Sequence, residues 1–191
     1  GVEQDLLINY FFYKLAEYGA SVASVQINIP SQQGLPSQIF GGKLIQFILQ
    51  YPESGTTPQL VISTLLKKLY ANSTVVVEGG DESVFGTNTT SKKPSDIWLE
   101  LDNNPYNLLE ITVKKVDGKR LDDCIQSLNS VGMLDRQVSF LCRIPEDIST
   151  LNGVQNGMLN YKNKIFNFVD ISSFVLSIVS LLSVDETQEI L

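Results

Sequence analysis

The chain has 191 residues, 43% of them hydrophobic, and a formal net charge of −7 with no histidine. The absence of histidine excludes His-based catalytic dyads and triads, histidine-ligated zinc and an imidazole general base. Two cysteines far apart in the sequence exclude a structural zinc site as well. Any chemistry must therefore rest on carboxylates, lysines, hydroxyls and a hard metal ion.

The length fits one compact domain, and the start at Gly1 in place of Met suggests a piece of something larger. No apolar run approaches the roughly 20 residues that cross a bilayer, and no basic secretory segment opens the chain, so no membrane association is expected. Cys124 and Cys142 each lie in an apolar periodic segment. We expect both to be core thiols of a cytoplasmic protein.

The first part of the chain predicts helices. Apolar residues recur at spacings of three and four in three segments, which are residues 3–18, 40–51 and 59–70. Pro52 and Pro58 separate the second segment from the third. We expect residues 1–72 to form a helical part that packs on a core formed by residues 73–191.

From residue 73 the pattern changes to strands. The alternation of apolar residues predicts strands at 74–78, at 97–101 and at 109–113, with the last two joined by a turn over DNNPYN (residues 102–107). The elements expected after this hairpin are a helix at 121–131 with Gly132 at its C-terminal cap, strands at 137–144 and 164–169, and a helix at 171–182. Strand, helix and strand in this order form a parallel crossover, so the fold class is α/β, with a mixed sheet flanked by helices.

The hairpin carries the candidate site. If its strands pair about the turn, Asp96 falls close to opposite Thr112, and Glu110 lies diagonally from Asp96 on the same face. Lys114 has the parity of Glu110 and shares that face. Two carboxylates beside a lysine can hold a divalent cation against a phosphate, and the carbonyl of Ile111 is a third candidate ligand.

These residues resemble the PD-(D/E)XK nuclease superfamily, typified by type II restriction endonucleases. The resemblance rests on Pro94, Ser95 and Asp96 before one strand and on Glu110 within the next, followed by a crossover helix and a further strand. It implies a restriction-endonuclease-like fold in which Asp96 and Glu110 bind Mg²⁺, with Mn²⁺ tolerated. Many members add an upstream acid, for which Glu78 is the candidate.

Thr112 occupies the position where the family has its lysine. This Glu-x-Thr variant of the motif resembles the one in some restriction-enzyme families. Three lysines near the two carboxylates remain candidates for the missing ammonium group. These are Lys114, Lys92 and Lys93.

The resemblance implies a Mg²⁺-dependent DNA endonuclease, most simply the catalytic domain or subunit of a restriction-type defence enzyme. We expect DNA as the substrate, and a homodimer or a partner subunit or domain that recognises sequence. The net charge of −7 counts against nucleic acid, but several basic residues gather around the hairpin. Two alternatives remain open, which are an inactive DNA-binding or interaction module of the same fold and a structure-specific repair or recombination nuclease.

Overall fold

The computed structural model describes residues 2–23, 36–80 and 93–190. The chain forms two compact units, Gly1–Gln33 and Gly34–Leu191. The first unit contains α1 (Val2–Ala23), a helix in the segment where the sequence predicts one, and its exposed side chains include Tyr10, Phe11 and Phe12. Within the described residues, no helix combines the length and the apolarity that a membrane crossing requires.

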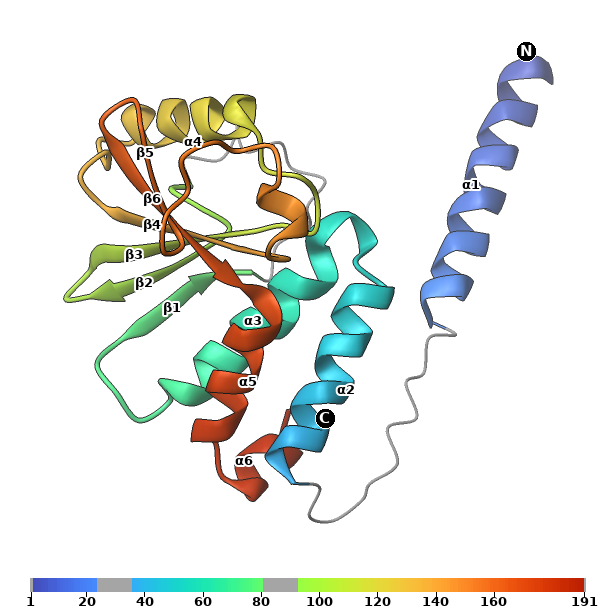
Figure 1. Cartoon of the computed structure of the whole chain (residues 1–191). Helices are drawn as coiled ribbons and strands as arrows, with labels where there is room; N and C mark the ends of the chain where they lie inside the picture. Colours follow the sequence, from blue (N-terminus) through green and yellow to red (C-terminus); the bar gives the residue numbers. More distant parts are fainter. Residues whose placement is uncertain (1, 24–35, 81–92, 191) are drawn as a thin grey trace. The chain divides into compact units, whose positions relative to one another are not determined.

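The second unit is an α/β structure with a six-stranded mixed sheet flanked by helices (Figure 1). Its helices and short 3₁₀ turns are α2 (Ser37–Gln50), η1 (Glu53–Gly55), α3 (Thr56–Leu69), α4 (Gly118–Ser130), η2 (Glu146–Ile148), α5 (Ile171–Leu181) and α6 (Val184–Gln188). Its strands are β1 (Val76–Gly79), β2 (Ile97–Leu101), β3 (Asn104–Ile111), β4 (Gln137–Cys142), β5 (Met158–Tyr161) and β6 (Lys164–Asp170).

The strand order in the sheet is β1-β2-β3-β4-β6-β5. The strands β1, β2 and β3 form an antiparallel meander, whereas β3, β4 and β6 are parallel to one another and β5 pairs antiparallel with β6. The parallel pairing of β3 with β4 across α4 confirms the predicted crossover. The carboxyl ends of β3, β4 and β6 therefore lie at the same end of the sheet.

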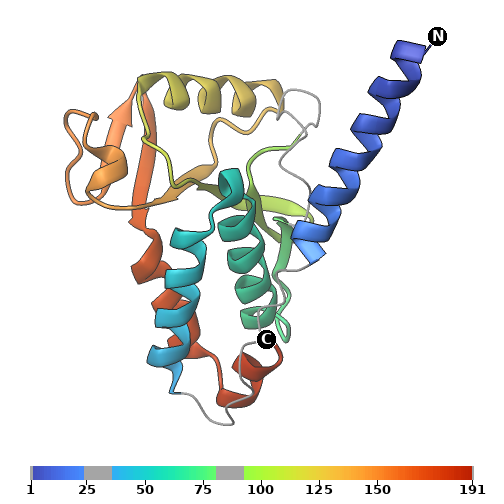
Figure 2. The same cartoon turned by 90° about the vertical axis from the view of Figure 1, so that its right-hand side faces the viewer.

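Helices cover both faces of this sheet (Figures 1 and 2). One core lies between the sheet and α2, α3 and α5, and it contains Ile62, Ile97 and Val175. The other lies under α4 and contains Leu121 and Phe140. Helices α2 and α3, which the sequence analysis placed in the helical part of residues 1–72, thus share a core with the strands. The two cysteines are buried and free, as predicted.

Most of the predicted elements are present within a few residues of their expected ends. Gly132 has φ 72° directly after the C-terminal cap residue of α4, and Asp170 caps α5 by accepting a hydrogen bond from the Ser173 amide at 2.8 Å. The short elements β5 and α6 were not predicted.

The predicted six-residue turn of the hairpin is wrong. The turn consists of Asp102 and Asn103, both with positive φ (52° and 61°), and β3 begins at Asn104. Positive φ at both central residues is typical of the tight turns whose twist matches paired strands. Pro105 is tolerated in β3 because β4 pairs with β3 only from Asn107 onward, so Pro105 has a strand on one side alone.

The predicted register is wrong as well, because the tight turn shifts the pairing. Ile97 pairs with Leu109, so Asp96 lies level with Glu110 and not with Thr112. A bulge between the Leu99–Asn107 and Glu100–Pro105 pairs adds one residue to β3.

Candidate functional site

Two carboxylates meet where β2 begins and β3 ends. The amide of Ile111 donates a hydrogen bond of 2.8 Å to Oδ2 of Asp96. The hydroxyl of Ser95 lies 3.1 Å from Oε1 of Glu110 and 2.7 Å from the carbonyl oxygen of Leu109. These bonds tie the residues just before β2 to the end of β3, so the structure brings Asp96 and Glu110 together as the sequence predicts.

Burial makes this pair electrostatically unusual. Desolvation is the main cause that raises the pKa of Glu110 to about 8, and the charge of Asp96 raises it further. Desolvation also raises the pKa of Asp96, although the Ile111 amide and Arg120 oppose the shift. Only 12% of the Glu110 side chain is exposed. Two carboxylates in this position repel each other, and a divalent cation would relieve that repulsion.

Arg120, which the sequence analysis did not select, lies beside this pair. Its Nη2 is 3.9 Å from Oε2 of Glu110. The residue lies in the first turn of α4, where its amide donates a hydrogen bond of 2.9 Å to the side chain of Asp117, the N-cap. The helix that follows the glutamate strand therefore delivers a positive charge to the carboxylates.

Gln59 is a second residue that the sequence analysis missed. Its side chain donates a hydrogen bond to Asp96 from the first half of α3. Gly80 permits this close approach of α3 to the end of β1, because a Cβ on Gly80 would lie 2.3 Å from Cβ of Ser63. The hydroxyl of Ser63 also donates a hydrogen bond of 3.0 Å to the carbonyl of Gly79. An amide side chain thus lies next to Asp96.

Thr112 and Lys114 do not continue the face of Glu110. The strand β3 ends at Ile111, and the hydroxyl of Thr112, which is buried, accepts a hydrogen bond of 3.0 Å from the amide of Lys114. This local contact turns the backbone, and the side chain of Lys114 is exposed. The expectation that Lys114 shares the strand face of Glu110 is therefore wrong, because the strand stops before it.

Two of the other predicted residues, Glu78 and Lys93, lie in the described part of the chain. Glu78 is exposed on β1 and lies opposite Trp98 of β2. Asp96 lies instead beside Gly80, whose amide donates a hydrogen bond of 3.0 Å to the Asp96 carbonyl. Lys93 is half-buried, and its charge lowers the pKa of Asp96 slightly relative to the larger effect of desolvation. Lys92 lies outside the described residues.

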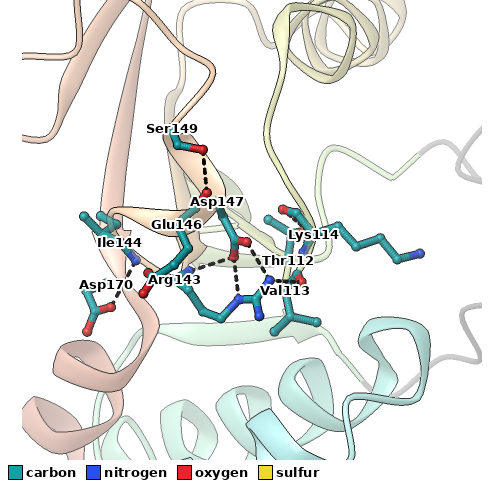
Figure 3. Close-up of polar contacts among 9 residues, drawn as sticks. All are labelled: Thr112, Val113, Lys114, Arg143, Ile144, Glu146, Asp147, Ser149 and Asp170. Atoms are coloured by element: carbon teal, nitrogen blue, oxygen red, sulfur yellow. Dashed lines mark hydrogen bonds and ion pairs between the residues drawn. The ribbon is translucent and has the colours of Figure 1, made fainter.

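An ion pair between the half-exposed Arg143 and the buried Asp147 fixes the segment that joins β3 to α4 (Figure 3). The guanidinium of Arg143 donates to both carboxylate oxygens of Asp147, at 3.0 and 2.7 Å, and to the carbonyl of Val113 at 2.6 Å. The amide of Val116 in turn donates to the carbonyl of Asp147 at 2.7 Å. Figure 3 shows the Lys114 side chain pointing away from this cluster. The Arg143–Asp147 pair therefore holds the backbone that leads from Glu110 to Arg120.

The oxygen atoms at the site fit a hard divalent cation. In the described part of the chain, no three His, Cys, Asp or Glu side chains form a metal-binding group. A cation here would take two carboxylates, with water and a carbonyl completing its shell, as Mg²⁺ commonly does. Because the Thr112 amide donates to Leu141 on β4, the amide and carbonyl of Ile111 face the other side, toward Asp96. Asp96, Glu110 and the Ile111 carbonyl are thus the residues that would hold the ion.

Comparison with protein-family models gives no match for this chain, and comparison with curated protein sequences gives none either.

Proposed function

We propose that this protein is a Mg²⁺-dependent endonuclease that hydrolyses phosphodiester bonds in DNA, built on a restriction-endonuclease-like fold. The observation that carries the proposal is the pair of Asp96 and Glu110 at the junction of β2 and β3, where the Ile111 amide and the Ser95 hydroxyl contact the two partly buried carboxylates. The order of hairpin, crossover helix α4 and parallel strand β4 supports the same class. Mn²⁺ is expected to replace Mg²⁺, since both accept oxygen ligands.

The residues divide the work of hydrolysis. A bound Mg²⁺ would supply Lewis-acid polarisation of the phosphate and lower the pKa of water. Asp96 and Glu110 would hold the ion, while the Ile111 amide and the Ser95 hydroxyl orient their carboxylates. In the overall reaction, a water oxygen bonds to phosphorus, one ester P–O bond breaks, and the leaving oxygen ends protonated.

The charge near the site is compatible with DNA in spite of the net charge of −7. Lys114 and Lys115 are exposed on the segment that joins β3 to α4. Cations on this segment would contact phosphates flanking the bond that is cut. Cutting both strands of a duplex takes two such sites, so we propose a homodimer or a partner subunit, with recognition of sequence supplied by a further domain or by the partner.

The test is cleavage of supercoiled, linear and branched DNA with Mg²⁺ or EDTA. We expect Asp96→Asn and Glu110→Gln each to reduce the rate about a hundredfold or more, because each removes a charge that neutralises or positions the ion. The matched control is Asp135→Asn. Asp135 is 73% exposed and precedes β4, at the opposite end of that strand from the site. Equal rates for all four proteins would refute the assignment, and cutting confined to branched DNA would favour a structure-specific repair nuclease.

One observation favours a second candidate, a catalytically inactive DNA-binding module of the same fold. The position of the family's lysine is occupied by Thr112, whose hydroxyl is engaged by the Lys114 amide. DNA binding without any Mg²⁺-dependent cutting, together with no Mg²⁺ binding by calorimetry, would support this candidate over the nuclease.

A further inference from the structure

Arg120 occupies a position that does not serve its own helix. It lies in the first turn of α4, and that turn contains no acidic residue. The helix macrodipole places partial positive charge at this end and therefore disfavours a cation there. Asp117 already provides the N-cap by accepting from the Arg120 amide. A role in stabilising α4 does not explain this guanidinium.

The guanidinium of Arg120 also retains hydrogen-bonding capacity. Its Nη2 lies 3.9 Å from Oε2 of Glu110, which is within reach of an ion pair but too long for a hydrogen bond. Its Nε is buried and has no hydrogen-bond partner among the described residues. A buried donor without a partner is unfavourable, so it marks a place where an acceptor is expected. The side chain is 35% exposed, which leaves it open to a ligand from solvent.

The other cations near the pair are less suited to this position. Lys114 lies beyond the end of β3 with its side chain exposed, and the charge of Lys93 acts on Asp96 and not on Glu110. Among the described residues, Arg120 is the cation that forms an ion pair with Glu110 itself. Its planar guanidinium also offers several donors in a fork that matches phosphate oxygens.

We propose that Arg120 binds a non-bridging oxygen of the scissile phosphate. This inference rests on the proposed nuclease function. In the ion-free protein Arg120 offsets part of the charge of Glu110. A bound divalent cation would offset the charge of Glu110, which would leave the guanidinium of Arg120 available to a phosphate oxygen.

The test compares Arg120→Gln and Arg120→Lys with Lys119→Gln as the matched control. Lys119 is the adjacent exposed residue of the same helical turn, so its substitution makes the same change in net charge. Two quantities are measured for each protein, which are the affinity for Mg²⁺ alone by calorimetry and the kcat and KM for cleavage of a duplex oligonucleotide. Thermal unfolding of each variant checks that it is folded.

For Arg120→Gln we expect cleavage to fall about a hundredfold to a thousandfold, the usual effect of removing one donor to a developing oxyanion. The affinity for Mg²⁺ should remain equal or become severalfold tighter, because a positive charge that competes for Glu110 is gone. Arg120→Lys should retain part of the rate, and Lys119→Gln should keep cleavage within about threefold of wild type.

The outcomes separate this inference from the nuclease proposal. If the wild type cuts DNA and Arg120→Gln cuts equally well, the Arg120 assignment is overturned alone. If Arg120→Gln loses affinity for Mg²⁺ in proportion to its rate, Arg120 only positions the carboxylates and does not bind phosphate. A wild type that neither binds Mg²⁺ nor cuts would overturn both proposals. If Arg120→Gln unfolds, Arg120→Lys decides: a rate equal to that of wild type at unchanged Mg²⁺ affinity would overturn the assignment.

Discussion

Removing the charge of Glu110 should stabilise the ion-free protein at neutral and alkaline pH. Glu110→Gln keeps the size of the side chain and its Oε1, which can still accept from the Ser95 hydroxyl. It removes the ionised form that burial and Asp96 disfavour. A substitution that abolishes the proposed activity is thus expected to make the fold more stable, which an ordinary structural carboxylate would not do.

The direction of the pH dependence of stability follows from the number of protons that Glu110 binds in the folded and unfolded states. Between the ordinary pKa of 4.5 and the folded pKa of about 8, the folded state holds more protons on Glu110 than the unfolded state does. The free energy of unfolding therefore decreases as pH rises through this window, by at most about 1.4 kcal/mol per pH unit. Below the unfolded pKa the contribution is fully favourable, and above the folded pKa it no longer changes.

The full shift corresponds to at most about 5 kcal/mol. Asp96 and Glu110 repel each other when both are ionised, so ionising Asp96 raises the pKa of Glu110. The shift is therefore a property of the pair. We therefore expect a smaller gain for Glu110→Gln, about 2 kcal/mol, or roughly 4 to 8 °C in Tm for a domain of this size.

The assay is thermal and urea unfolding in EDTA at several pH values between about 5 and 8. The control is Glu78→Gln, which neutralises a carboxylate that is exposed on β1. The Tm of Glu110→Gln should exceed that of wild type increasingly as pH rises, whereas Glu78→Gln should follow wild type. Adding Mg²⁺ at the upper end of the range should stabilise wild type more than Glu110→Gln. A Glu110→Gln protein that is less stable than wild type throughout would refute the reasoning.

Two further predictions concern the parts that support the site. Arg143→Ala removes the guanidinium partner of the Asp147 carboxylate, which is 1% exposed and keeps the amide of residue 143 as a donor, and should lower the free energy of unfolding by about 1.5 to 3 kcal/mol in urea titrations; a loss below about 1 kcal/mol would show the pair to be dispensable. Gly80→Ala forces a Cβ to 2.3 Å from Ser63 at a φ of +82° and should destabilise by about 2 kcal/mol or more. The control Gly42→Ala adds a Cβ inside α2 with no atom within 4 Å and should instead be neutral or stabilising by up to about 1 kcal/mol; equal effects at both glycines would contradict the packing argument.

The sequence predicted most of the α/β framework because that framework follows local rules. Apolar spacing of three or four residues identified α2, α3 and α4, and alternation identified β2 and β3. The same alternation selected Asp96 and Glu110, since polar residues that flank or interrupt apolar strands are visible without any tertiary contact. The short elements β5 and α6 were missed because four or five residues carry too little periodicity.

The register of the hairpin could not be predicted in the same way. Pro105 and the neighbouring asparagines suggested a wide turn, whereas the backbone turns at Asp102 and Asn103 with positive φ and then forms a bulge. Each residue of shift changes which side chains lie opposite each other. The position of Glu110 beside Asp96, and the end of β3 before Lys114, depend on this local geometry.

Arg120 and Gln59 lie at the site for a different reason. They belong to α4 and α3, on helices that pack against opposite faces of the sheet. One feature of the sequence could have pointed to Arg120, namely a basic residue in the first turn of the helix that follows the glutamate strand.

The sequence by itself thus identified the α/β fold class and the two candidate carboxylates, Asp96 and Glu110, because hydrophobic periodicity and turn chemistry act between residues close along the chain. The tertiary structure alone decided which cation faces those carboxylates and which amide supports Asp96. Those contacts form where α3 and α4, which come from separate segments of the chain, approach the same end of the sheet. The packing of the two cores sets the distance between each of these helices and the sheet.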